Sequence, residues 1–306
     1  MAKMEIGNTI KRLREMKKIT QEELASYIMH PVTLSRIENG KIMPSMKTLE
    51  ALFERLGYDP GKSANLFLHN KAVGIDKTVN ELDTAMGKRN IAEMKSLLNK
   101  LEKNRRYMQE NLNVQYITFM KGMTRYLEGG LDDALGLFID AIKATIPGFC
   151  AESIHKYLLS AADRRIITMI AVIYKKNGQV EDAANLYYKL KENFDANVVD
   201  RLELGRQYTV LLFNLVLSLV PLGRYEEVLE LCETCIKMCI DTGFGYVLPS
   251  ITCYKAIALY ETGKSASPDC LELLLKQAYY GCLLFEQSDD SEFVKNFAKE
   301  KLGLDL

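Results

Sequence analysis

Residues 20–25 read TQEELA and residues 33–40 read TLSRIENG, and these two stretches decide the fold of the N-terminal region. Thr20 can accept a hydrogen bond from the backbone at the start of a helix, while Glu23 reaches back to the N–H of Thr20. This reciprocal pattern is a capping box, and it fixes where the first of two helices begins.

A second helix is expected to begin at His30 and Pro31, because proline, which lacks an N–H, is tolerated at a first helical position. Asn39 and Gly40 are expected to end it, since glycine, and less readily asparagine, adopts the left-handed conformation found after a helix C-terminus. Two short helices joined by a tight turn form a helix-turn-helix.

Apolar residues flank this motif at three- and four-residue spacing, the period of one face of a helix. The spacing predicts two further helices, so the motif is expected to lie inside a small helical bundle. The apolar residues are Ile6, Ile10 and Leu13 ahead of the motif, and Leu49, Leu52, Phe53 and Leu56 behind it.

Through these residues, segment 5–66 resembles the XRE (Cro/repressor-like) DNA-binding family. Pro44-Ser45 followed by Thr48-Leu49 is similar to that family's usual entry to its fourth helix. Between Ala25 and Ser35 the chain is one residue shorter than in most XRE proteins. This shorter turn resembles that of the PlcR-type regulators in the RRNPP group of peptide sensors. The resemblance implies a five-helix domain that binds an operator in double-stranded DNA.

The resemblance also implies which side chains face the base edges: Pro31, Val32 and Arg36, with Thr33 at the margin. An arginine can donate two parallel hydrogen bonds to guanine, whereas valine can only pack on a thymine methyl group. The alternative for Arg36 is a surface arginine paired with Glu38 or with a phosphate.

Phosphate contacts are expected from Gln21, Asn39, Lys41 and Ser45, which would position the protein without reading sequence. Gln21 would act together with the free backbone N–H groups of the first helical turn. Residues 1–66 hold 11 Lys and Arg against 8 Asp and Glu, a net charge of about +3. Affinity gained by neutralising phosphates grows with the number of contacts, so two such domains, and hence a homodimer, are expected.

The whole chain has 306 residues, 48% of them hydrophobic and 26% charged, with no net charge, as in soluble globular proteins. We expect a cytoplasmic protein with no membrane association, because there is no signal peptide and the most apolar stretch, residues 210–222, is only about 13 residues long. The seven cysteines are expected to be reduced in that compartment.

Long helical patterns and few β-branched clusters predict that everything after residue 76 is helical, which makes the protein all-α. Similar turns follow apolar helices at 130–134 (GLDDA), 178–183 (GQVEDA), 223–228 (GRYEEV) and 260–263 (YETG). Units of this size resemble tetratricopeptide (TPR) repeats, which stack into an α-solenoid with a concave, peptide-binding face.

An XRE domain followed by about five such units resembles the organisation of the RRNPP regulators. The expected domains are an XRE domain at residues 1–66, a linker helix at 67–75, and a TPR-like domain for peptide binding and dimerisation at 76–306.

Asn214 is surrounded by large apolar residues, so its amide needs partners, because an unpaired buried amide costs roughly 1–3 kcal/mol. A helix backbone is already bonded to itself, which predicts that the amide faces another chain. One alternative is a bond to a neighbouring helix; the other is a grip on the backbone of a bound peptide. The PlcR-like resemblance places Asn214 on a family asparagine that has the second role.

The same resemblance places Lys88 and Arg89 where the family presents basic groups to the acidic end of the peptide. Thr168 replaces a second family asparagine. Other side chains that could line the same face, or instead be ordinary core or surface residues, are Tyr126, Arg165, Tyr208 and Tyr254.

No constellation points to catalysis, a cofactor or a metal. Cys232, Cys235 and Cys239 share a helical face, but no histidine or fourth cysteine lies near them in sequence, so apolar packing is the better interpretation. The three histidines are scattered, and there is no phosphate-binding glycine loop.

The sequence thus predicts a quorum-sensing transcription regulator that binds operator DNA and a short signalling peptide. One alternative is an XRE-type repressor of a mobile element whose helical body is only a scaffold for dimerisation or protein docking. Another is a TPR adaptor that inhibits a protein partner and carries a vestigial DNA-binding domain.

Overall fold

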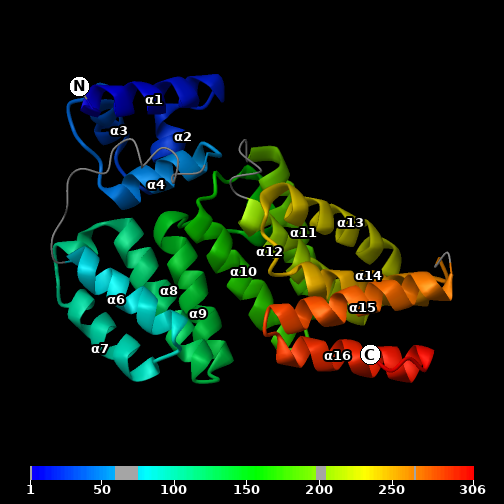
Figure 1. Cartoon of the computed structure of the whole chain (residues 1–306). Coiled ribbons are helices and arrows are strands. Elements are labelled where there is room, and N and C mark those ends of the chain that lie inside the picture. The colour runs from blue at the N-terminus through cyan, green and yellow to red at the C-terminus, as the bar shows by residue number, and fades with distance from the viewer. Residues whose placement is uncertain (1, 59–74, 198–204, 265–266) are drawn as a thin grey trace. The chain divides into compact units, whose positions relative to one another are not determined.

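The structure is a computed structural model, and it describes residues 2–58, 75–197, 205–264 and 267–306. Within these ranges all regular elements are helices, which confirms the predicted all-α class (Figure 1). The chain divides into two compact units. Unit 1 is Met1–Ile173 with Asp195–Val199, and unit 2 is Tyr174–Phe194 with Asp200–Leu306.

Unit 1 begins with four helices, which we call the head. They are α1 (Ala2–Met16), α2 (Gln21–Ala25), α3 (Pro31–Glu38) and α4 (Met46–Arg55). A fifth helix of the head, and all but the last residue of the linker helix expected at 67–75, would lie outside the described residues.

The apolar residues at helical spacing form the core of the head, as predicted. Each of the seven is at most 8% exposed, and they pack with Leu24, Ala25, Leu34 and Ile37 of the helix-turn-helix. Gly7 lets α1 come close to α3, because a Cβ at that position would lie 2.2 Å from the carbonyl oxygen of Ile37. The sequence of α1 therefore fixes the position of the helix-turn-helix.

The rest of unit 1 is a succession of helices in which α6 packs on α7, α7 on α8 and α8 on α9. A Cβ at Gly122 of α8 would lie 2.6 Å from the Phe138 ring of α9, so only glycine permits this close packing. The elements are α6 (Ile75–Gly87), α7 (Ile91–Glu102), η1 (Tyr107–Gln109), α8 (Asn111–Leu127), α9 (Leu131–Thr145), η2 (Ala151–Lys156) and α10 (Ala161–Lys176), which ends in unit 2.

In unit 2, α12 packs on α13, α13 on α14, α14 on α15 and α15 on α16, in TPR-like helix pairs. The elements are α11 (Val180–Asn197), which ends in unit 1, α12 (Gly205–Leu219), η3 (Val220–Leu222), α13 (Tyr225–Thr242), α14 (Leu248–Thr262), α15 (Pro268–Leu284) and α16 (Ser288–Leu302).

The four predicted turns fall between consecutive helices. Gly129, Gly178, Gly223 and Gly263 have φ angles between +65° and +85°, the left-handed conformation that glycine adopts without strain. In the first turn this residue is Gly129, one position before the predicted glycine, and Gly130 is the N-cap of α9.

The apolar stretch in α12 is longer than the sequence pattern suggested. The 18 residues of Gly205–Leu222 have a mean hydropathy of 1.2, enough by length and composition to cross a membrane. Half of this segment is buried inside the structure. The side chains of Leu212, Leu215 and Leu219 are fully buried.

Candidate nucleic-acid interface

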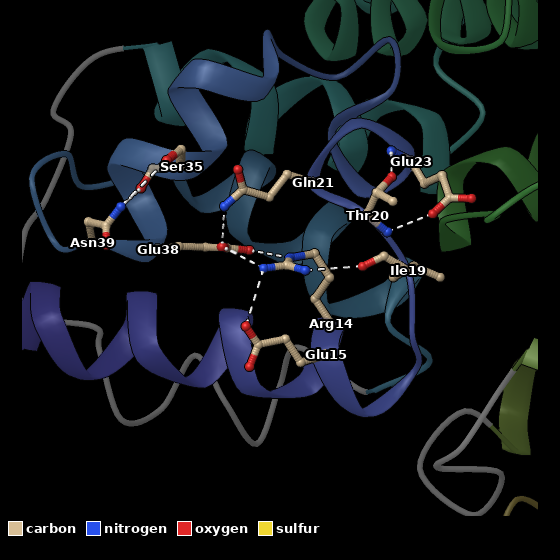
Figure 2. Close-up of polar contacts among 9 residues, drawn as sticks. All are labelled: Arg14, Glu15, Ile19, Thr20, Gln21, Glu23, Ser35, Glu38 and Asn39. Carbon is tan, nitrogen blue, oxygen red and sulfur yellow. Dashed lines mark hydrogen bonds and ion pairs between the residues drawn. The ribbon is translucent and has the colours of Figure 1, made fainter.

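The start of α2 has the predicted capping box. Thr20 Oγ1 accepts from the backbone N–H of Glu23 at 3.1 Å, and Glu23 Oε2 accepts from the backbone N–H of Thr20 at 2.6 Å (Figure 2). These bonds lower the pKa of Glu23, because they stabilise its ionised form. The capping box fixes the first residue of α2, and thereby the place where the helix presents its free N–H groups.

The predicted limits of α3 are also confirmed. His30 is its N-cap and accepts from the backbone N–H of Val32 through Nδ1 at 3.3 Å, and Pro31 occupies the first helical position. Asn39 is the C-cap, and its side chain donates to the carbonyl of Ser35 at 2.8 Å. Gly40 follows with a φ of +66°.

A buried polar cluster that the sequence did not reveal holds the three helices α1, α2 and α3 together. Glu38 is 1% exposed, and its carboxylate accepts from Arg14 Nε at 2.7 Å and Nη2 at 2.9 Å (Figure 2). Gln21 Nε2 donates to the same carboxylate at 2.6 Å. Bonding to Glu38 raises the pKa of Arg14. The sequence contains no local pattern that pairs Arg14 with Glu38, because the two residues are 24 positions apart.

This cluster changes what two of the predicted contact residues can do. The side chain of Gln21 points inward to Glu38, so its amide nitrogen is engaged inside the head, and in the first turn of α2 the backbone N–H of Glu23 is already bonded to Thr20. Glu38 is bound by Arg14, and among the described residues Arg36 has no ion pair. The alternative that Arg36 forms a surface ion pair with Glu38 is therefore not what the structure has, because Glu38 is buried and bonded to Arg14.

The outer face of α3 carries the side chains expected at the base edges. Val32 is 59% exposed and Arg36 is exposed one helical turn later, with Pro31 and Thr33 partly exposed between and beside them. The expected phosphate contacts are also at the surface: Asn39, Lys41 and Ser45 are exposed. Ser45 is in addition the N-cap of α4 and accepts from the N–H of Thr48 at 3.2 Å.

Inside unit 1, hydrogen bonds join the head to the helices that follow. Asn111 Nδ2 donates to the carbonyl of Tyr27 at 2.8 Å. Lys47 Nζ donates to Tyr107 Oη at 3.0 Å. The carboxylate of Glu54 in α4 accepts from the backbone N–H of Ala161, the first residue of α10, at 2.6 Å. No local pattern in the sequence signals these contacts, because each joins residues far apart in the chain.

Unit 1 also contains five of the residues expected to contact a peptide. Lys88 and Arg89 are exposed at the turn after α6. Arg165 lies over the ring of Phe119, with its guanidinium carbon 4.9 Å from the ring centroid. Tyr126 is half-buried, and Thr168 is partly buried and donates to the carbonyl of Arg164 at 2.8 Å.

Asn214 in unit 2 corrects one step of the sequence argument. Its Nδ2 donates to the backbone carbonyl of Val210 in its own helix at 2.9 Å. A backbone carbonyl that already accepts within the helix can therefore accept from the side-chain amide as well. The expectation that the amide must face another chain was wrong in that respect. Asn214 is half-buried, its backbone carbonyl accepts from Ser218 Oγ at 2.9 Å, and its side-chain Oδ1 has no hydrogen-bond partner among the described residues.

The two tyrosines of unit 2 differ in exposure. Tyr208 is 4% exposed and stacks on Phe194 with 4.7 Å between ring centroids, which places it in the core. Tyr254 is partly buried between Phe213 and Phe293, whose ring centroids lie 6.3 Å and 6.0 Å away. Burial raises the pKa of Tyr254 to about 12.

The cysteines of α13 are packed in the interior. Cys232, Cys235 and Cys239 are at most 2% exposed, and burial raises the pKa of Cys232 to about 12. In the part of the chain that the structure describes, no group of three or more His, Cys, Asp or Glu side chains is placed to hold a metal ion.

The comparisons with known proteins agree with this geometry. Residues 10–62 match the helix-turn-helix family HTH_3. PlcR of Bacillus thuringiensis, solved in complex with the peptide PapR7 and DNA, is 18% identical with a TM-score of 0.58, over 96% of this chain and 99% of that chain. PlcR in its apo form is 17% identical with the same TM-score, over 96% of this chain and 98% of that chain.

No curated protein matches the chain significantly in sequence. The matched domain is a helix-turn-helix, and one of the two PlcR structures contains DNA. At 18% identity the likeness to PlcR establishes the fold alone. Residues 10–62 are therefore a helix-turn-helix domain, carried by a chain that has the fold of the RRNPP regulator PlcR.

Proposed function

We propose that this protein is a cytoplasmic transcription regulator that binds operator DNA as a homodimer and is switched by a short signalling peptide, as in quorum sensing. The observation that carries the proposal is the capped helix-turn-helix, in which α3 is locked by Glu38 and presents Val32 and Arg36 outward. A rigid helix with exposed side chains of this kind suits insertion into the major groove.

Binding of a peptide is supported by the kind of scaffold and by the side chains that it presents. Stacked TPR-like helix pairs offer an extended surface, and PlcR, which has the same fold, was solved with the peptide PapR7 and DNA. In unit 2 the side-chain Oδ1 of Asn214, which has no hydrogen-bond partner among the described residues, suits a peptide N–H. In unit 1 the exposed Lys88 and Arg89 suit a carboxylate.

The proposal is tested with synthetic peptides that match the small open reading frames beside the gene. A peptide that binds the folded protein raises its unfolding temperature in a saturable way, by a free energy RT ln(1 + [L]/Kd). The peptide must also change the affinity for DNA, because a ligand shifts a conformational equilibrium only when it prefers one state. A repressor with a scaffold body would bind operator DNA and show neither response.

A further inference from the structure

A basic segment lies at the end of α7 and in the loop before η1, outside the helix-turn-helix. Its cations are Lys100, Lys103, Arg105 and Arg106, all exposed. The acidic residue of the same stretch, Glu102, is engaged by Lys121 and does not neutralise them. Among the described residues none of the four cations has an ion pair. Exposed cations without acidic partners favour an anionic ligand.

The loop that carries these cations is held in place by its own contacts. Asn104 Oδ1 accepts from the backbone N–H of Tyr107 at 3.1 Å, and Tyr107 is 8% exposed. Lys47 of the head donates to Tyr107 Oη at 3.0 Å and lies 3.9 Å from the ring centroid of Tyr116. The basic segment is therefore fixed against the head within unit 1.

The attachment points lie beside the residues expected to touch DNA. Tyr27, which accepts from Asn111, is four positions before Pro31, and Lys47 is two positions after Ser45. The residues that follow the basic segment are thus bonded to the head close in sequence to the positions expected to meet the duplex. This attachment favours DNA over other polyanions as the ligand.

We propose that Lys103, Arg105 and Arg106 bind the phosphate backbone of the duplex next to the half-site that α3 reads. Such contacts add affinity and fix register without reading bases. They matter here because the region containing the head, residues 1–66, has a net charge of only about +3. The inference rests on the proposed DNA-binding function and extends it to a second surface.

The test measures how the affinity of the full-length protein for a labelled 30-base-pair mixed-sequence duplex depends on salt. This duplex has about three helical turns, so it reaches beyond one half-site. The triple variant Lys103→Gln, Arg105→Gln, Arg106→Gln should lower the slope of log K against log [NaCl] by about 2–3, since each phosphate contact contributes roughly 0.9. The matched control, Lys237→Gln, Lys295→Gln, Lys301→Gln in unit 2, removes the same charge and should change the slope by less than about 1.

Thermal unfolding of both variants at the wild-type temperature verifies that they are folded, as expected because five of the six side chains are exposed and Lys295 is only partly buried. A triple variant with the wild-type slope, or with the slope of the control, would overturn the inference and leave the proposed function intact. A wild-type protein that does not bind the duplex at all would overturn both. A slope lowered in the triple variant alone supports the second surface.

Discussion

Glu38 is the residue on which the polar interior of the head depends. Its carboxylate is buried, so it must be compensated, and Arg14 and Gln21 together supply three hydrogen bonds to it. Because Glu38 belongs to α3, this cluster sets the position of the helix that presents Arg36. Its effect on DNA recognition is one of positioning.

Replacing Arg14 with methionine should strongly weaken the head. The change leaves a buried carboxylate with Gln21 as its side-chain partner, and breaking a buried ion pair in this way costs about 3–5 kcal/mol. Hydrogen exchange of the amides of α3 in the full chain reports the free energy of local opening. The double variant Arg14→Met, Glu38→Met removes the charge together with its partner and should lose clearly less. Equal losses in the two variants would count against the account.

Arg36 and Lys41 are expected to differ in the kind of DNA contact they make. Arg36→Ala should remove discrimination among operators worth roughly 1–3 kcal/mol, because it deletes a base contact. Lys41→Ala should weaken binding to all sequences alike and lower the salt slope by about 1. Competition between specific and nonspecific duplexes measures both effects. An Arg36→Ala variant that loses specific and nonspecific binding equally does not make a base contact.

Asn214 is expected to matter for the ligand and not for the fold. The amide bonds only to Val210 of its own helix among the described residues, so Asn214→Ala removes no support between helices. The variant should keep its melting temperature and lose about 1–3 kcal/mol of peptide affinity, the cost of unpaired peptide groups. Calorimetric titration with the peptide found by thermal shift measures the loss. A variant that melts far below the wild type would show that Asn214 has a structural role.

At the scale of elements, the sequence predicted best what local chemistry decides. Thr20 with Glu23, His30 with Pro31, and Asn39 with Gly40 mark the ends of α2 and α3 where the structure has them. In each case a residue acts on neighbours no more than a few positions away, so the signal lies within the motif itself.

Contacts between distant parts of the chain were beyond what the sequence could predict. Arg14 bonds to Glu38 across 24 positions and Glu54 to Ala161 across 107. A charged residue looks the same in a sequence whether it is buried or exposed, until its partner is known. For the same reason Tyr208 could be read as a groove residue or as an ordinary core or surface residue, and its burial and its stacking on Phe194 assign it to the core.

The contact between α4 and α10 should depend on pH through Glu54. Burial raises the pKa of this carboxyl from 4.5 to about 7, although the bond from Ala161 and the nearby Arg164 act in the opposite direction. Because the folded-state pKa is the higher one, the contribution to stability is fully present below about pH 4.5 and is lost as the pH rises through 7.

Between pH 5 and pH 8 the wild type should therefore lose roughly 1–3 kcal/mol of stability relative to Glu54→Gln, which has no charge to bury. Calorimetric unfolding of both proteins at several pH values measures this difference. The two proteins should respond alike if Glu54 remains ionised throughout the range, and that result would show that the carboxyl is well hydrated.

At the scale of the whole molecule, the proposed regulator consists of a head that reads DNA and a body that senses a peptide. The region containing the head has a net charge of only about +3. One such head supplies few phosphate contacts, so tight binding calls for a pair of heads related by two-fold symmetry. A two-fold axis in the protein requires two inverted half-sites in the DNA, about one helical turn or a multiple of it apart.

The most direct test of the central claim is selection of bound sequences from a random duplex library by the full-length protein, with and without the peptide found by thermal shift. The account predicts an enriched motif of two inverted half-sites, lost in Arg36→Ala, whose occupancy changes when the peptide is added. Enrichment of a single half-site would contradict the dimer. Selection of no motif by a folded wild-type protein, with or without peptide, would contradict the claim that this chain reads DNA.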